Sequence, residues 1–120
     1  MYPPGERGQA AERRAEAYLK AQGLALRARN YRCKAGEIDL IMQDGQTLVF
    51  VEVRLRRRRG YASAAETLDG RKQRKLMRAA QHYLLCQGLT DKLNCRFDLV
   101  AFDTGPGDNQ TQWIQNAFGV

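Results

Sequence analysis

Two carboxylates and an arginine lie on a predicted β-hairpin, where they could together do metal-assisted chemistry. Residues 36–42 and 48–54 are apolar alternating runs separated by Asp44-Gly45. This dipeptide is a strong turn signal, because glycine tolerates the positive φ that the favoured hairpin turns need. Acids on otherwise apolar strands are costly unless something compensates their charge, and a divalent cation can do so. The candidate chemical side chains of the hairpin are Asp39, Glu52 and Arg54.

The register of the hairpin decides which side chains share a face. A two-residue turn at Asp44-Gly45 pairs residues whose numbers sum to 89, which places Asp39 opposite Phe50. A three-residue turn would instead move Asp39 to the opposite face. With the shorter turn, one face is predicted to hold Glu37, Asp39, Glu52 and Arg54. The alternative interpretation is structural, with one acid solvated and another paired with a neighbouring arginine.

The two acids suit Mg²⁺, or Mn²⁺ in its place. Mg²⁺ takes oxygen ligands and typically needs one or two carboxylates plus a substrate phosphate. Held by Asp39 and Glu52, it could orient a phosphodiester and lower the pKa of an attacking water. Arg54 could stabilise the developing charge, but it could not act as a general base, since guanidinium stays protonated. The single histidine, His82, argues against a histidine triad or a zinc site.

Composition predicts one cytoplasmic domain over residues 1–120, with residues 1–6 loosely ordered. The chain is 43% hydrophobic, which is ordinary for a globular protein. It has no apolar run of some 18 residues, so no membrane-spanning segment is expected. Its three cysteines, an odd number without close pairing, are expected to be reduced and mostly buried.

Positive charge is concentrated in one stretch. Residues 54–78 carry ten arginines and lysines against two acids, a net +8, whereas the whole chain carries +7. Such a concentration favours a polyanionic partner, and we expect a nucleic acid, DNA first. A solvated basic face and attraction to an anionic membrane surface are the alternatives. The predicted nucleic-acid-binding residues are Arg56, Arg57, Arg58, Arg59, Arg71, Lys72 and Lys75.

The periodicity of the apolar residues and the positions of the turn-forming residues predict an α/β fold with a mixed sheet and the order α-β-β-β-α-β-β. Because a strand–helix–strand crossover joins them, the third and fourth strands should be parallel. The expected elements are a helix from residue 6 or 7 to 22, strands 24–32, 36–42 and 48–54, a mobile basic loop 56–70, a helix 71–87, and strands 95–102 and 113–118.

Glu12 lies on or beside the inner face of the first predicted helix. It could be a third acid aimed at the hairpin. The local pattern alone favours a boundary glutamate that pairs with Arg13 or Lys20.

Four ordered motifs make the chain similar to the small bacterial YraN family. They cover nearly the whole chain and read 36-GEIDLI-41, 49-VFVEVR-54, 72-KQRKL-76 and 96-RFDLVAF-102. That family is grouped with the Holliday-junction-resolvase-like branch of the PD-(D/E)xK nuclease superfamily. The resemblance implies a restriction-endonuclease-like fold and metal binding by Asp39 and Glu52. It also implies that Glu12, as the first-helix glutamate, is a third metal-binding and catalytic acid.

The chain departs from the superfamily's Glu-x-Lys, because Arg54 stands where the lysine is expected. Arginine keeps the charge but cannot give up its proton, so the exchange is not conservative. Three hypotheses follow. Arg54 acts electrostatically, a lysine such as Lys72 or Lys75 reaches the site, or the domain binds nucleic acid without cutting it.

The leading functional hypothesis is therefore a Mg²⁺-dependent endonuclease acting on DNA, with branched DNA a candidate substrate. Junction cleavage needs two active sites, so a homodimer would be expected for that activity. The alternative is a non-catalytic basic module of nucleic-acid or ribonucleoprotein complexes, with Asp39 and Glu52 retained as structural charge pairs.

Overall fold

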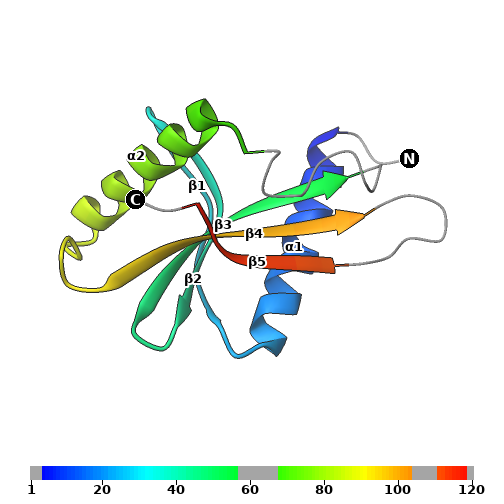
Figure 1. Cartoon of the computed structure of the whole chain (residues 1–120), viewed down its shortest axis with the longest axis horizontal. Coiled ribbons are helices and arrows are strands. Elements are labelled where there is room, and N and C mark those ends of the chain that lie inside the picture. The colour runs from blue at the N-terminus through cyan, green and yellow to red at the C-terminus, as the bar shows by residue number, and fades with distance from the viewer. Residues whose placement is uncertain (1–3, 57–67, 104–110, 119–120) are drawn as a thin grey trace.

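One mixed five-stranded sheet organises the protein, and a helix packs on each of its faces (Figure 1). The computed structural model describes residues 4–56, 68–103 and 111–118. The elements are α1 (Pro4–Ala21), β1 (Ala25–Cys33), β2 (Gly36–Asp44), β3 (Thr47–Arg56), α2 (Gly70–Cys86), β4 (Asn94–Asp103) and β5 (Thr111–Phe118). The predicted α/β class and element order are confirmed.

The strands lie in sequence order across the sheet, from β1 at one edge to β5 at the other. Neighbouring strands are antiparallel except β3 and β4, which are parallel as predicted. The chain crosses from β3 to β4 through α2, as a parallel pair requires. The N-terminal end of α2 therefore lies near the C-terminal end of β3, where two of the candidate site residues are located.

Helix α1 covers one face of the sheet through a stripe of small and apolar side chains. Ala11, Ala15 and Leu19 recur at helical spacing and pack against Leu40 and Val51. The helix begins at Pro4, earlier than predicted, and proline is well suited to a first helical turn. The last turn is closed by hydrogen bonds beyond Ala21, with Gly23 at φ 100°.

Helix α2 covers the other face and is fixed at its start by Asp69. The Asp69 carboxylate accepts a hydrogen bond of 2.8 Å from the Lys72 backbone N–H, an N-cap that satisfies one of the free donors of the first turn. Further along, apolar side chains of α2 pack on Phe50 and Phe97. The cap fixes the turn that carries Lys72.

The hairpin register differs from the prediction by two residues. Asp44 pairs with Thr47, so paired numbers sum to 91, and the turn residues are Gly45 and Gln46 rather than Asp44 and Gly45. The predicted opposition of Asp39 and Phe50 is therefore wrong, because Phe50 pairs with Ile41. Side chains along a strand alternate between the two faces of the sheet. A shift of two residues therefore leaves each side chain on its predicted face, and the prediction that Asp39 and Glu52 share a face does not depend on the difference.

Other predictions have mixed outcomes. Cys33 is half-buried, but Cys86 and Cys95 are exposed, so the expectation of mostly buried thiols is wrong. The basic loop falls largely on residues 57–67, outside the described residues. Neither helix of the described chain is long and apolar enough to span a membrane.

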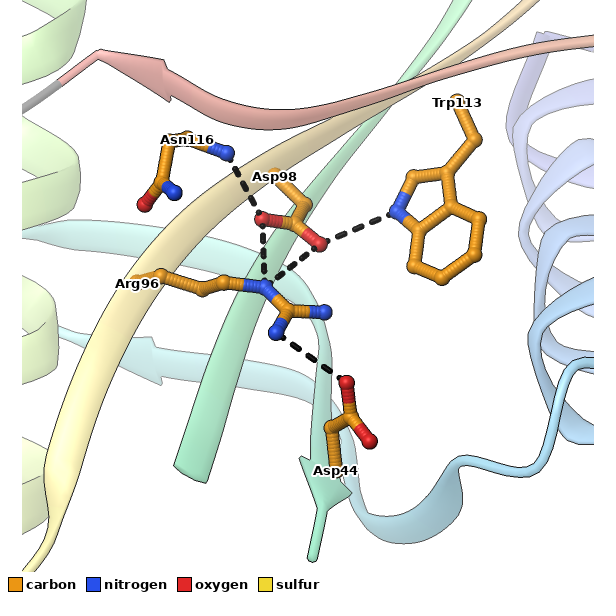
Figure 2. A network of polar contacts seen from close by, with 5 residues as sticks. All are labelled: Asp44, Arg96, Asp98, Trp113 and Asn116. Atoms are coloured by element: carbon orange, nitrogen blue, oxygen red, sulfur yellow. Dashed lines mark hydrogen bonds and ion pairs between the residues drawn. The ribbon is translucent and has the colours of Figure 1, made fainter. Parts of the chain in front are cut away.

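A buried ionic network ties β5 to the rest of the sheet (Figure 2). Asp98 is fully buried in β4 and accepts hydrogen bonds from the Arg96 Nε, the Trp113 Nε1 and the Asn116 backbone N–H, at 2.9–3.1 Å. Arg96 also reaches Asp44 at the hairpin turn, 3.1 Å away. The pairing of β4 with β5 shifts register beside Asp98, and its carboxylate takes the Asn116 N–H there. This aspartate therefore serves the fold.

Candidate metal and phosphodiester site

The candidate site forms where β2 and β3 stop pairing. The ladder between them begins at Leu40↔Val51, and Asp39 and Glu52 lie just beyond it. Instead of meeting a backbone carbonyl, the Val53 N–H donates to the Asp39 Oδ2 at 2.8 Å. Here the hairpin opens, and an acid from each strand is left at the opening.

Two cations flank the Glu52 carboxylate. Glu52 is only 5% exposed. The Lys72 Nζ, from the first turn of α2, lies 2.8 Å from the Glu52 Oε2, and the Arg54 Nε lies 3.4 Å from the same oxygen. Both contacts are ion pairs without hydrogen-bond alignment, since neither Oε2 nor the Arg54 Nε has a hydrogen-bond partner within the described residues. The oxygen is therefore near positive charge but still able to accept a directed bond.

Glu12 reaches the same site from α1. Its Oε1 accepts a hydrogen bond of 2.5 Å from the Asn30 side-chain amide. Asn30 lies in β1 with φ of 48°, a left-handed conformation that asparagine tolerates better than most residues. The predicted pairing of Glu12 with Arg13 or Lys20 is not seen; Lys20 pairs with Glu16 instead.

These side chains line one open pocket of about 250 Å³, called here the acid pocket. Three elements contribute chemical groups to it: the first half of α1, the opening of the hairpin and the start of α2. Its lining residues are Gly8, Ala11, Glu12, Asp39, Glu52, Val53, Arg54, Leu55 and Lys72. Within the described ranges, no three carboxylate, histidine or cysteine side chains are arranged to hold a metal ion, so the pair Asp39 and Glu52 is the donor set to consider.

Burial and repulsion perturb Asp39. Desolvation, the adjacent Glu52 carboxyl and the charge of Glu12 together raise the pKa of its carboxyl to about 8, against the opposing hydrogen bond from the Val53 N–H. Asp39 therefore holds its proton near neutral pH unless a cation displaces it. A carboxyl pair of this kind is typical of sites that act on substrates or bind metals.

Not every residue that the sequence assigned to the site reaches it. Glu37 is exposed, lies 3.4 Å from Arg32 of β1 and does not line the acid pocket. Arg71 and Lys75 are exposed on α2 and do not line the acid pocket, whereas Lys72 does. The side chains of Arg56, Arg57, Arg58 and Arg59 lie outside the described residues.

Sequence reasoning missed Asn30 and the small residues Gly8 and Ala11, which leave room for the acid pocket. The residue types of Gly8 and Ala11 do not indicate a functional site in the sequence. Asn30 interrupts a strand with a residue that favours turns, which could have marked it as an irregular position.

Comparison with known proteins shows where the chain belongs. Residues 11–102 match the model of a family described as "Uncharacterised protein family UPF0102". The UPF0102 protein of Nitrosospira multiformis is 52% identical over 114 residues, covering 95% of this chain and 93% of its own. That of Saccharophagus degradans is 50% identical over 118 residues, covering 98% and 97%. The match spans most of the chain and nearly the full length of these relatives, as the resemblance to YraN predicted: the protein belongs to the family UPF0102.

Proposed function

We propose that this protein is a metal-dependent endonuclease that binds DNA in the cytoplasm and hydrolyses its phosphodiester bonds, with branched DNA as the first substrate to test. The observation that carries the proposal is the convergence of Asp39 and Glu52 at the open end of the hairpin, with Glu12, Lys72 and Arg54 in the same pocket.

The donor set fits Mg²⁺ or Mn²⁺. Asp39 and Glu52 would hold the ion, with Glu12 in the same pocket, and the Glu52 Oε2 is buried without a directed partner in the described chain. Mg²⁺ needs few protein carboxylates and uses substrate phosphate for the remainder. When bound, it would supply charge neutralisation and an activated water.

The contrast between the half-buried Asp39 and the fully buried Asp98 favours chemistry over a structural charge pair. Asp98 has an arginine, an indole N–H and a backbone N–H as partners. Asp39 accepts a hydrogen bond from the Val53 N–H and otherwise faces two acids, Glu52 and Glu12, with no cationic partner among the causes that shift its pKa. A carboxylate retained for the fold would be expected to have the first kind of surroundings.

Lys72 offers the proton-bearing group that Arg54 cannot supply. Its ammonium reaches Glu52 from α2 and is 44% exposed, so it lies at the mouth of the acid pocket. Lysine can deliver or accept a proton, while the fixed charge of Arg54 can only stabilise a phosphate. In this arrangement Lys72 would supply the proton transfer, and Arg54 the positive charge, that a single lysine supplies in the superfamily.

Incubation of the purified protein with labelled single-stranded, duplex and four-way-junction DNA tests the proposal. We expect cleavage of at least one substrate with Mg²⁺ or Mn²⁺, and binding without cleavage in EDTA. Binding with no cutting in either metal would favour the alternative, a non-catalytic nucleic-acid-binding module. Absence of binding at moderate salt would overturn both.

Lys72→Met is expected to lower the cleavage rate at saturating DNA by roughly 100- to 1,000-fold, the usual contribution of a positioned proton donor or acceptor. Lys72→Arg should show a similar loss of cleavage rate, because arginine keeps the charge but cannot give up its proton. Lys75→Met is the matched control, since it removes the same charge one turn away, outside the acid pocket. Equal losses in both lysine variants would show that Lys72 acts only as general positive charge.

A further inference from the structure

A basic groove runs from the acid pocket along α1 and β1. The α1–β1 groove is a hollow of about 390 Å³ lined by Arg13, Glu16, Ala17, Lys20 and Arg29. A smaller hollow of about 110 Å³ shares three of these residues and extends to Glu12 and Asn30. Glu12 in turn lines the acid pocket. The three hollows are therefore neighbours, each sharing at least one lining residue with the next, and the last of them is the acid pocket.

The buried Glu16 holds two cations in place along this groove. Arg29 donates to both Glu16 oxygens, from Nε at 2.6 Å and from Nη2 at 2.9 Å, and the Lys20 Nζ lies 2.7 Å from Oε2. The hydrogen bond from Arg29, aided by Lys20, lowers the pKa of Glu16 to about 2 against the effect of its burial. Glu16 is therefore a fixed anion, and it orders the two side chains that lie over it.

The cations remain available to a ligand. Side chains of Arg29 and Lys20 are 57% and 49% exposed, and the pair with Glu16 leaves the Arg29 Nη1 for another acceptor. Arg13 is also exposed. Three positive charges against one buried negative charge give the groove a net charge of +2, and guanidinium groups suit phosphate oxygens.

We propose that the α1–β1 groove binds the sugar–phosphate backbone of the nucleic-acid strand on one side of the scissile phosphate. The inference rests on the proposed function, and it adds a binding surface separate from the arginine run and α2. Arg13 and Lys20 are seven residues apart on α1, about 10 Å along the helix. That separation is long enough for the two cations to contact different phosphates of one strand.

The position of Glu12 connects this groove to the acid pocket. Asn30, in its left-handed conformation on β1, donates to Glu12 between the groove and the acids. A strand lying over Arg13 and Arg29 would pass Asn30 and Glu12 before its phosphate reached Asp39 and Glu52.

The salt dependence of DNA binding tests the groove, measured by fluorescence anisotropy in EDTA with labelled duplex and single-stranded DNA. Lys20→Gln should weaken binding about eightfold at 0.1 M salt and reduce the salt slope by about 0.9, the value for one phosphate contact. Arg13→Gln/Lys20→Gln should weaken it about sixtyfold and reduce the slope by about 1.8. Lys92→Gln is the matched control, since Lys92 is exposed on the turn between α2 and β4 and should change binding less than about twofold.

The outcomes separate this inference from the proposed function. If the wild-type protein binds and cleaves DNA and the double variant binds equally well with an unchanged slope, the groove is not a strand-binding surface and the nuclease proposal stands. If the wild-type protein binds no DNA, both fall. Binding of poly-glutamate that needs Arg13 and Lys20, with DNA binding unaffected, would assign the groove to an acidic polypeptide and overturn the inference.

Discussion

Asp39→Asn and Glu52→Gln should each reduce metal-dependent DNA cleavage by roughly a thousandfold or more, while DNA binding in EDTA stays within a few-fold of wild type. Each change removes one of the two carboxylates that would hold the metal ion. A metal ligand supplies several kcal/mol of transition-state stabilisation, and each 1.36 kcal/mol is a tenfold change in rate. Binding depends mainly on the basic surfaces, whose arginines and lysines both substitutions leave in place.

Asp39→Asn should also make the folded protein more stable. A loss of DNA cleavage in this variant could then not be explained by a loss of folding. The pKa of Asp39 is raised from 3.8 to about 8, so the folded protein holds a proton that the unfolded chain releases. Stability from the neutral carboxyl is present below pH 3.8 and is lost as pH rises through 8. Asparagine carries no charge, so at pH 8 and above the variant should gain at least about 1 kcal/mol in urea unfolding.

The control for both measurements is Glu37→Gln on the same strand. Glu37 is exposed, pairs with Arg32 and does not line the acid pocket, so the substitution should change cleavage and stability little. If Asp39→Asn were less stable than wild type at pH 8, Asp39 would be a structural residue. If it still cleaved DNA, the assignment of the metal site would be wrong.

The sequence could predict the acid pair because strand geometry repeats every two residues. The hairpin turn is one step further along than Asp44-Gly45 indicated, yet the error is even, so Asp39 and Glu52 still meet. An error of one residue would have separated them. The ladder ends at Leu40, so the register of β2 and β3 does not extend to Glu37, which lies beside Arg32 instead of in the acid pocket.

Contacts between distant segments could not be predicted in the same way. The pairing of Glu12 with Asn30 joins α1 to an edge strand and depends on the left-handed conformation of one residue. Sequence spacing offered Arg13 and Lys20 as partners, which are closer along the chain. The choice between Lys72 and Lys75 likewise depended on the Asp69 cap, which sets where α2 begins and so which lysine faces Glu52.

The motif that contains Asp98 is part of the family resemblance, but the resemblance alone does not say whether a residue of a motif takes part in chemistry or stabilises the fold. Asp39 and Asp98 both accept a backbone N–H where a sheet ladder is interrupted. Asp98 also has Arg96 as a counter-charge and is closed off from solvent, whereas Asp39 opens onto a pocket. The same hydrogen-bonding arrangement therefore accompanies a register shift at Asp98 and an open pocket at Asp39.

Asp98→Ala should accordingly lower the free energy of unfolding by about 3–5 kcal/mol, the usual cost of removing one partner from a buried ion pair. The substitution leaves the Arg96 guanidinium, only 14% exposed, without its buried carboxylate, and it leaves the Trp113 and Asn116 N–H groups without an acceptor. Trp113 is the single tryptophan, so its fluorescence during urea unfolding reports on this network directly.

Two further variants keep this test informative if Asp98→Ala fails to fold. Trp113→Phe removes one donor and should cost about 1–2 kcal/mol, followed by circular dichroism in place of fluorescence. Asp44→Asn changes the 44% exposed end of the same network and should cost less than about 1 kcal/mol. Equal losses for Asp44 and Asp98 would contradict the assignment of Asp98 as the buried anchor. A stable Asp98→Ala protein with lost DNA cleavage would place Asp98 with the functional acids instead, because a residue that serves only the fold cannot be removed without a cost in stability.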